Sequence, residues 1–282
     1  MYFKYFEFKE PPFNLTPNSK FFFEGNKHKE ALNNLFYAIN QRKGFIVITG
    51  EIGSGKTTVS RALINKFDKN TEVALITNTH LNCKDLLLTL LEDLEIEFQP
   101  GFYKAKLLSR LNDYLLVQAS RGINVVLIID EAQNLKPSAL EEVRMLSNLE
   151  TETDKLIQIV LIGQPELKHK LGLCRLEQLR QRVAIYFHLS PLTFEEMQEY
   201  ILYRLKIASQ SDREYFSSEA LQLVYQFSNG VPRLINQICD SALLTGYVDG
   251  FKIIDEYIMR EVIGESPMKQ LSIVKNHAVA CN

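Results

Sequence analysis

The nine residues from Gly50 to Thr58 constrain the fold of this chain more than any other stretch. They read Gly-Glu-Ile-Gly-Ser-Gly-Lys-Thr-Thr and match the phosphate-loop pattern G-x-x-x-x-G-K-[ST] in full. Glycines allow the backbone of such a loop to curl around a polyphosphate and to point several N–H groups at it. The residues predicted to bind a nucleotide are Gly50, Glu51, Ile52, Gly53, Ser54, Gly55, Lys56, Thr57 and Thr58.

Two side chains of this loop are expected to have distinct chemical roles. Lys56 would place its ammonium group on the β and γ phosphates, and the Thr57 hydroxyl would complete the shell of a Mg²⁺ ion. The flanking sequence favours this interpretation over a plain glycine-rich turn. A buried strand is predicted over 44–49, and apolar residues recur at helical spacing from Val59 to Phe67. Strand, loop and helix thus follow in the order that the motif requires.

A second motif follows the apolar run from Val125 to Ile129, which is typical of a strand buried on both faces. Asp130 and Glu131 come directly after this run. A carboxylate at the carboxyl end of a strand beside the phosphate loop can reach the metal ion, so we expect Asp130 to bind Mg²⁺ together with Thr57. Glu131 is placed to polarise an attacking water as general base. The pair therefore indicates hydrolysis, and it disfavours a nucleotide switch that does not hydrolyse.

Predicted strands and helices alternate from the loop to Pro191. Besides the strand before the loop, strands are expected over 72–77, 124–129, 156–162 and 183–189. This alternation predicts an α/β P-loop fold, a parallel sheet of five strands with helices on both faces. After Pro191 a small all-helical lid is expected, with helices over 193–209, 217–228, 232–248 and 255–263.

These patterns divide the chain into four parts. They are an aromatic arm over 1–25, a nucleotide-binding α/β domain over 26–190, a helical lid over 191–264 and a loose tail over 265–282. The arm is rich in phenylalanine and carries three prolines. We expect it to pack against the nucleotide-binding domain, because its rings would otherwise be left in water. A base-stacking site is the less favoured alternative.

Composition excludes several classes of protein. A net charge of −2 does not demand a nucleic acid or an acidic membrane as partner. The four cysteines are scattered singly, which favours reduced thiols over a disulfide framework or a zinc site. The N-terminus has no signal-peptide pattern, and no apolar run approaches the ~20 residues that cross a bilayer. We therefore expect a cytoplasmic chain without a transmembrane segment.

Further motifs extend the pattern along the chain. They are Pro12-Phe13-Asn14-Leu15-Thr16-Pro17, Ala132-Gln133-Asn134-Leu135, Gly163-Gln164-Pro165-Glu166-Leu167, Leu179-Arg180-Gln181-Arg182-Val183 and Gly230-Val231-Pro232-Arg233-Leu234-Ile235-Asn236. With the phosphate loop and the acidic pair, they resemble an AAA+ ATPase and, more narrowly, the ExeA/GspA branch of general secretion pathway ATPases. The resemblance covers roughly residues 1–264. Members of that branch often continue into a membrane span and a periplasmic domain, and this sequence has neither, so a short, soluble subgroup is expected.

The resemblance implies roles for several more residues. Gln164 would sense the γ-phosphate, and Arg233, at the start of a lid helix, would contact the same phosphate. Arg182 would be an arginine finger that reaches the nucleotide of a neighbouring subunit, with Arg180 as the alternative. Asn78 would restrain the catalytic glutamate. Guanidinium groups suit these tasks because negative charge is spread over the phosphoryl group during transfer.

The expected function is that of a Mg²⁺-dependent ATPase that works as a homo-oligomer. It would remodel or position a protein partner in a secretion or exopolysaccharide assembly system. The alternative is a DNA-directed AAA+ ATPase of the transposition target-selector or origin-recognition type. The predicted lid disfavours DNA, because residues 191–264 carry six basic and eleven acidic side chains.

Overall fold

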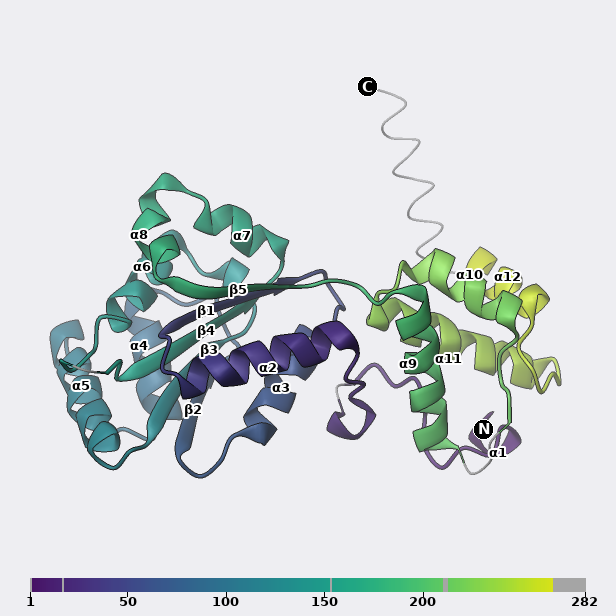
Figure 1. Cartoon of the computed structure of the whole chain (residues 1–282), viewed down its shortest axis with the longest axis horizontal. Helices are drawn as coiled ribbons and strands as arrows, with labels where there is room; N and C mark the ends of the chain where they lie inside the picture. The colour runs from purple at the N-terminus through teal and green to yellow at the C-terminus, as the bar shows by residue number, and fades with distance from the viewer. Residues whose placement is uncertain (1, 17, 153, 210–212, 266–282) are drawn as a thin grey trace, which may run out of the picture. The chain divides into compact units, whose positions relative to one another are not determined.

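The computed structural model describes residues 2–16, 18–152, 154–209 and 213–265 (Figure 1). The chain forms two compact units. The sheet unit comprises residues 27–52 and 56–190, and the helical unit comprises residues 1–26, 53–55 and the chain from 191 onward. The predicted tail over 265–282 lies outside the described residues, apart from Glu265.

The sheet unit is built on five parallel strands in the order β2-β3-β4-β1-β5. The strands are β1 (Phe45–Gly50), β2 (Thr71–Ile76), β3 (Asn124–Ile129), β4 (Ile157–Gly163) and β5 (Val183–Leu189). The predicted α/β fold with a five-stranded parallel sheet is confirmed. Because β4 lies between β3 and β1, the loops that follow these three strands meet at one edge of the sheet.

Helices cover both faces of this sheet (Figure 1). Alternate residues of the strands, such as Val47, Leu127 and Ile159, share one core with the helices that cover the first face. Those helices are α4 (Cys83–Asp93), α5 (Lys104–Ser120), α6 (Pro137–Leu146), α7 (Pro165–Leu171) and α8 (Glu177–Gln181). On the other face lie α2 (Asn26–Asn40) and α3 (Lys56–Lys66), whose apolar side chains are also buried. Burial on both faces explains why the strands read as continuous apolar runs.

In the described part of the helical unit, four longer helices follow Pro191. They are α9 (Phe194–Ala208), α10 (Ser218–Ser228), α11 (Pro232–Val248) and α12 (Glu256–Glu265). Local signals mark their ends: Thr193 and Glu196 form a capping box at the start of α9, and Pro232 opens α11. In the described part of the chain, no helix combines the length and the apolar character that crossing a bilayer requires.

The aromatic arm packs within the helical unit, so the expectation that it packs against the nucleotide-binding domain is wrong. Its short helices are α1 (Tyr2–Tyr5) and the 3-10 turn η1 (Ser19–Phe21). Arg204 of α9, which is only 6% exposed, donates from Nε to the carbonyl oxygen of Pro12 at 2.6 Å and from Nη2 to that of Asn14 at 3.2 Å. The arm residues that share a core with α9 to α12 are Tyr2, Phe6, Phe8, Phe13 and Phe21. The rings thereby add the apolar area that a small helical unit needs.

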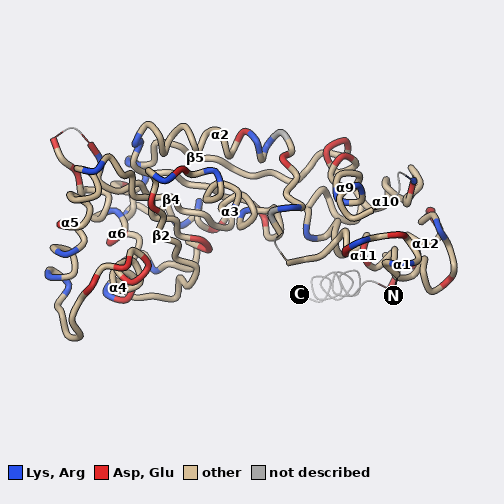
Figure 2. The backbone as a smooth tube through the Cα atoms, turned by 90° about the horizontal axis from the view of Figure 1, so that it is seen from below, with Lys and Arg blue, Asp and Glu red and all other residues tan. Residues whose placement is uncertain are grey.

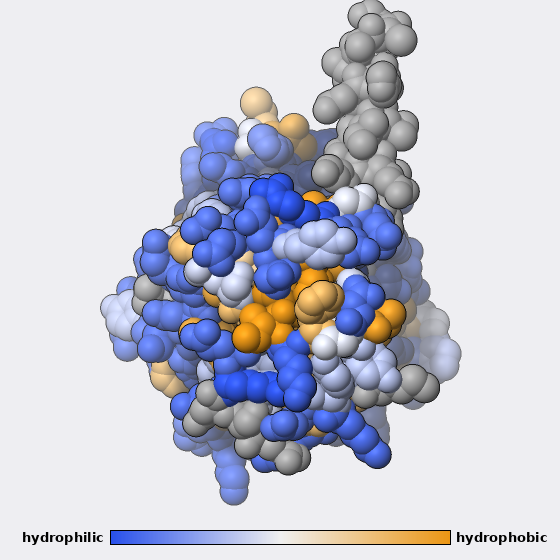
Figure 3. All heavy atoms as spheres, turned by 90° about the vertical axis from the view of Figure 1, so that its right-hand side faces the viewer, coloured by the Kyte–Doolittle hydropathy of each residue, from blue (hydrophilic) through white to orange (hydrophobic). Residues whose placement is uncertain are grey.

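The helical unit also leaves apolar side chains on its surface, at the end of α11, in the loop that follows and on α12. Leu244, Val248, Phe251, Ile253 and Tyr257 are each between 44% and 72% exposed. Figure 3 shows a face of the molecule on which apolar residues gather within a border of hydrophilic ones. Surface patches with this character are typical of sites that contact other proteins.

Replacing Gly230 by alanine is expected to destabilise the helical unit. Gly230 has a φ of +74°, and an added Cβ would lie 1.9 Å from the backbone oxygen of Leu192. Backbone strain and this clash together should lower the free energy of unfolding by at least ~2 kcal/mol, measured by urea titration with circular dichroism. Gly250→Ala is the matched control, because Gly250 has a φ of +79° but an added Cβ would meet no atom within 4 Å. Its loss should be about 1 kcal/mol, and equal losses would contradict the steric explanation.

Candidate active site

The predicted phosphate loop joins β1 to α3. Gly53 and Gly55 have φ values of +83° and +94°, a left-handed conformation that side chains rarely adopt. Lys56 opens α3 and is buried, and its Nζ donates to the carbonyl oxygens of Gly50 and Glu51, both at 2.8 Å. The loop therefore folds around its own ammonium group. The amide groups of the helix start and this ammonium group together make a site suited to an anion.

The two residues predicted to bind Mg²⁺ are brought together. Thr57 Oγ1 donates to Asp130 Oδ2 at 3.0 Å, and Asp130 Oδ1 accepts a hydrogen bond from the Glu131 N–H at 2.9 Å. Asp130 follows β3 and Thr57 belongs to the first turn of α3. Hydroxyl and carboxylate oxygens are ligands that Mg²⁺ prefers. The donor set thus fits this ion.

Burial disfavours the charged forms of two groups in the site, the Asp130 carboxylate and the Lys56 ammonium group. Burial raises the pKa of Asp130, although hydrogen bonds from Glu131 and Thr57 act in the opposite direction. Burial likewise lowers the pKa of Lys56, although the carboxylates of Glu131 and Asp130 favour its charged form. A divalent cation beside Asp130 and a polyphosphate beside Lys56 would supply the missing opposite charges.

Glu131 has a strained backbone. Its φ is 53° and its ψ is 36°, a left-handed conformation that is uncommon for a residue with a side chain. Hydrogen bonds on either side hold the strained residue: its carbonyl oxygen accepts from Thr79 Oγ1 at 3.1 Å and from the Asn134 N–H at 3.0 Å. Strain of this kind concentrates at functional sites, where the surrounding structure sustains it.

Two glutamine side chains hold the carboxylate of Glu131. Gln133 Nε2 donates to Glu131 Oε2 at 2.6 Å, and Gln164 Nε2 donates to the same oxygen at 3.1 Å. The backbone N–H of Gln164 donates in turn to Gln133 Oε1 at 3.0 Å. Gln164 follows β4, and its side chain lies against the carboxylate of Glu131. The contact of Gln133 was not predicted, although the residue lies in one of the motifs noted in the sequence.

Asn78 is not brought to Glu131 by the described contacts. It is exposed, and its Oδ1 accepts from the backbone N–H of His80 at 3.3 Å. The next residue, Thr79, is buried and makes the contact with the Glu131 carbonyl. The segment after β2 therefore does reach the glutamate, but one residue later than predicted and through the glutamate's backbone.

Arg233 lies beside the phosphate loop within the helical unit. Its backbone N–H donates to the carbonyl oxygen of Gly53 at 3.2 Å. A Cβ added to Gly53 would lie 2.5 Å from the Cβ of Arg233, so a glycine is needed for this approach. The predicted position of Arg233, at the start of a lid helix and close to the loop, agrees with these contacts.

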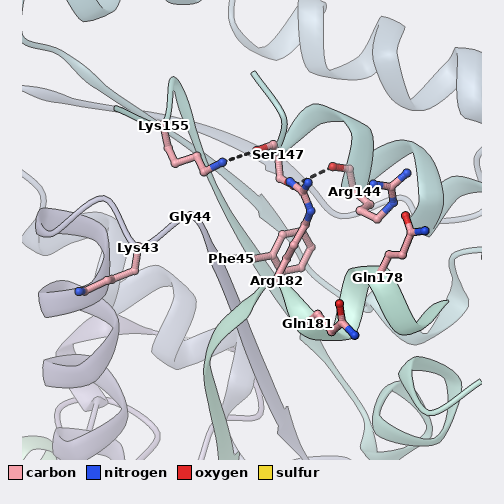
Figure 4. A pocket seen from close by; sticks show the side chains of 9 residues that line it. All are labelled: Lys43, Gly44, Phe45, Arg144, Ser147, Lys155, Gln178, Gln181 and Arg182. Atoms are coloured by element: carbon pink, nitrogen blue, oxygen red, sulfur yellow. Dashed lines mark hydrogen bonds between the residues drawn. The ribbon is translucent and has the colours of Figure 1, made fainter. Parts of the chain in front are cut away.

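Arg182 lines a cavity of about 490 Å³ in the sheet unit (Figure 4). Its Nη1 donates to Ser147 Oγ at 3.0 Å, and Lys155 Nζ donates to the Ser147 carbonyl oxygen at 3.4 Å. Figure 4 shows these three side chains close together, whereas Lys43 points away from them. Among the described residues that line the cavity, Lys43, Arg144, Lys155 and Arg182 are cationic and none is acidic.

This cavity is at the edge of the sheet opposite to the phosphate loop. Strand β5 pairs with β1 so that Val183 is opposite Phe45 and Leu189 is opposite Gly50. The five steps from Phe45 to Gly50 span about 17 Å of strand. Arg182 precedes Val183, so it lies farther from the loop of its own chain than an arginine side chain can reach. Arg180, the alternative finger, is exposed on α8, and its Nη2 lies 3.9 Å from Glu177 Oε1.

Comparison with known proteins agrees with this geometry. Residues 39–171 match the family model described as an AAA domain. The chain is 40% identical over 250 residues to General secretion pathway protein A of Aeromonas hydrophila, an alignment that covers 89% of this chain and 46% of that protein. The chain thus spans about half the length of this relative.

Several solved structures have a similar fold. The ADP form of the Aeropyrum pernix ORC2 protein has a TM-score of 0.68 at 14% identity, covering 92% of this chain and 73% of that one. Cdc6p from Pyrobaculum aerophilum has a TM-score of 0.65 at 20% identity, with 89% and 68% covered. The Thermotoga maritima RuvB Holliday junction branch migration motor has a TM-score of 0.56 at 17% identity, with 85% and 68% covered. At these identities the likeness establishes the fold alone.

Lys56→Ala is expected to abolish nucleotide binding. The carbonyl oxygens of the loop hold the Lys56 ammonium group in place, and without it the phosphates would lose their principal side-chain positive charge. Isothermal titration calorimetry with ATP and Mg²⁺ measures the effect. Lys69→Ala removes an exposed lysine in the turn after α3 and should leave the affinity unchanged. Unchanged affinity in the Lys56 variant would show that the nucleotide site is elsewhere.

Proposed function

We propose that this chain, which belongs to the AAA ATPases and is of the general secretion pathway protein A type, binds ATP with Mg²⁺ and hydrolyses the γ-phosphate. The observation that carries the proposal is the convergence of Lys56, Thr57, Asp130 and Glu131 after β1 and β3. A phosphate loop alone would support binding. The acidic pair, with Glu131 held by two amides, supports hydrolysis.

Each residue has a role that follows from its position. Lys56 neutralises phosphate charge, and the backbone amides of the loop hold the phosphates in place. Thr57 and Asp130 would hold Mg²⁺, which would supply positive charge to offset the negative charge that develops on the phosphate. Among the described contacts, both side-chain donors to Glu131 bind Oε2. Its Oε1 is therefore the oxygen placed to take a proton from the attacking water.

The active form is proposed to be a homo-oligomer, with Arg182 acting on the nucleotide of a neighbouring copy. Support comes from the strand register, which puts Arg182 at the edge of the sheet remote from its own loop. Support also comes from the cavity, in which Arg182 lies among other cationic residues. Arg233, beside Gly53, is proposed to contact the γ-phosphate within its own chain.

The energy of hydrolysis is proposed to position or remodel a protein partner in the cytoplasm, in a secretion or envelope assembly system. The name of the relative, General secretion pathway protein A, supports this direction. Figure 2 shows basic and acidic residues interspersed along each unit, which favours a protein over DNA as the partner.

Glu131→Gln tests the proposed hydrolysis. The variant keeps the shape of the side chain but cannot accept a proton, so ATP should bind normally while turnover falls by ~10²-fold or more. Phosphate release and calorimetry measure the two quantities. Glu97→Gln, at an exposed position, is the control and should hydrolyse normally. Near-normal turnover in the Glu131 variant would assign the general base to another group.

Arg182→Ala tests the proposed action between copies. ATP affinity should be retained and turnover should fall by ~10³-fold, because a finger stabilises charge that develops in the transition state. Mixing this variant with Glu131→Gln should restore part of the activity, since an intact Glu131 then meets an intact Arg182 from another copy. No recovery at any mixing ratio would contradict action in trans. Arg180→Ala is the matched control, and if only this variant loses turnover, the finger is Arg180.

A further inference from the structure

The carboxamide of Gln133 connects two residues of the candidate active site. Its Nε2 donates to Glu131 Oε2 at 2.6 Å, and its Oε1 accepts from the backbone N–H of Gln164 at 3.0 Å. One side chain therefore holds the catalytic carboxylate with its donor end and the end of β4 with its acceptor end. Gln164 completes a closed set of contacts, because its own Nε2 also reaches Glu131 Oε2 at 3.1 Å.

The surroundings of Gln133 leave room for this bridge and hold its backbone. A Cβ added to Gly163, the last residue of β4, would lie 2.8 Å from Gln133 Oε1. The absence of a side chain at Gly163 is thus what admits the Gln133 carboxamide. Lys170 of α7 binds the carbonyl oxygens of Gln133 and Leu135, so the 3-10 turn η2 (Ala132–Asn134) is anchored independently of the Gln133 side chain.

We infer that Gln133 is a positioning residue that holds Glu131 against the Gln164 sensor, so that base and sensor act as one hydrogen-bonded unit. The inference rests on the proposed ATP hydrolysis and adds to it a residue that does not itself touch the nucleotide. A carboxamide can donate to the carboxylate through its nitrogen and accept from the Gln164 N–H through its oxygen at the same time. A glutamate would present two acceptors, and an asparagine would be one methylene too short.

The bridge explains how a flexible acid can serve as a base at a defined point. A glutamate side chain has three rotatable bonds, and small displacements of a catalytic group cost large factors in rate. Both amide donors bind the same oxygen of Glu131, which fixes the plane of the carboxylate. Gln133 also joins the end of β3 to the end of β4, so a shift of Gln164 on contact with a phosphate would be passed to Glu131.

Steady-state hydrolysis and calorimetry of Gln133→Ala test this inference in the full chain. Turnover is expected to fall by ~10-fold or more, while ATP affinity stays within about twofold, because Gln133 acts only through Glu131. Gln99→Ala, which removes the same kind of side chain at an exposed position, is the matched control and should behave as the unmodified chain. Gln133→Glu should not rescue turnover, since it cannot donate to Glu131 when ionised.

Two double variants separate positioning from a structural role. In a Glu131→Gln background, Gln133→Ala should lower the residual rate no further, because the carboxylate that it positions is absent. Gly163→Ala, whose Cβ would lie 2.8 Å from Gln133 Oε1 and 2.9 Å from Leu167 Cδ2, should also lower turnover, and its effect should be smaller when Gln133 is already alanine. Normal turnover in Gln133→Ala, or a full further loss in the Glu131→Gln background, would overturn the inference. Full turnover in Glu131→Gln alone would remove Glu131 as the general base, whereas the absence of ATP turnover in the unmodified chain would overturn the proposed function.

Discussion

The parallel alignment of five strands is the constraint on which the rest of the structure depends. All carboxyl ends lie at one edge of the sheet, so the phosphate loop, Asp130 and Gln164 follow neighbouring strands and meet there. All amino ends lie at the opposite edge, where Lys155 and Arg182 line the cationic cavity. One sheet therefore separates two sets of charged groups by the length of its strands. Arg182, at the second edge, therefore lies out of reach of the phosphate loop of its own chain.

The edge of the sheet that carries the phosphate loop also holds charged groups that are costly to bury. Asp130 and Lys56 lie in an environment that disfavours their charged forms, and Glu131 has a left-handed backbone. Burial, strain and a closed set of amide contacts occur together within a few residues. In a site that binds a polyphosphate and a metal ion, such costs are offset on binding, and the groups already stand where the reaction needs them.

The helical unit shows how an arm can become part of a core. Its aromatic residues join α9 to α12, and Arg204 binds two carbonyl oxygens of the arm from a buried position. The same unit includes Gly53 and Gly55 of the phosphate loop, and the Arg233 N–H donates to the carbonyl oxygen of Gly53. A shift of Gly53 on nucleotide binding would therefore alter its hydrogen bond with Arg233 in the first turn of α11.

Local sequence determined much of this protein. The glycines of the phosphate loop, the apolar runs of β3 and β4, and the capping signals at Thr193 and Pro232 act over a few residues, so the elements they predict agree with the structure. The short helices α7 and α8 were not predicted, because seven and five residues carry too little periodicity to recognise. Only the tertiary structure decided the strand order, the place of the arm and the choice of Thr79 instead of Asn78. It also decided the contact of Gln133 with Gln164, which depends on the pairing of separate strands and on the absence of a side chain at Gly163. Such contacts join segments far apart in the chain, and no local pattern specifies which of them will meet.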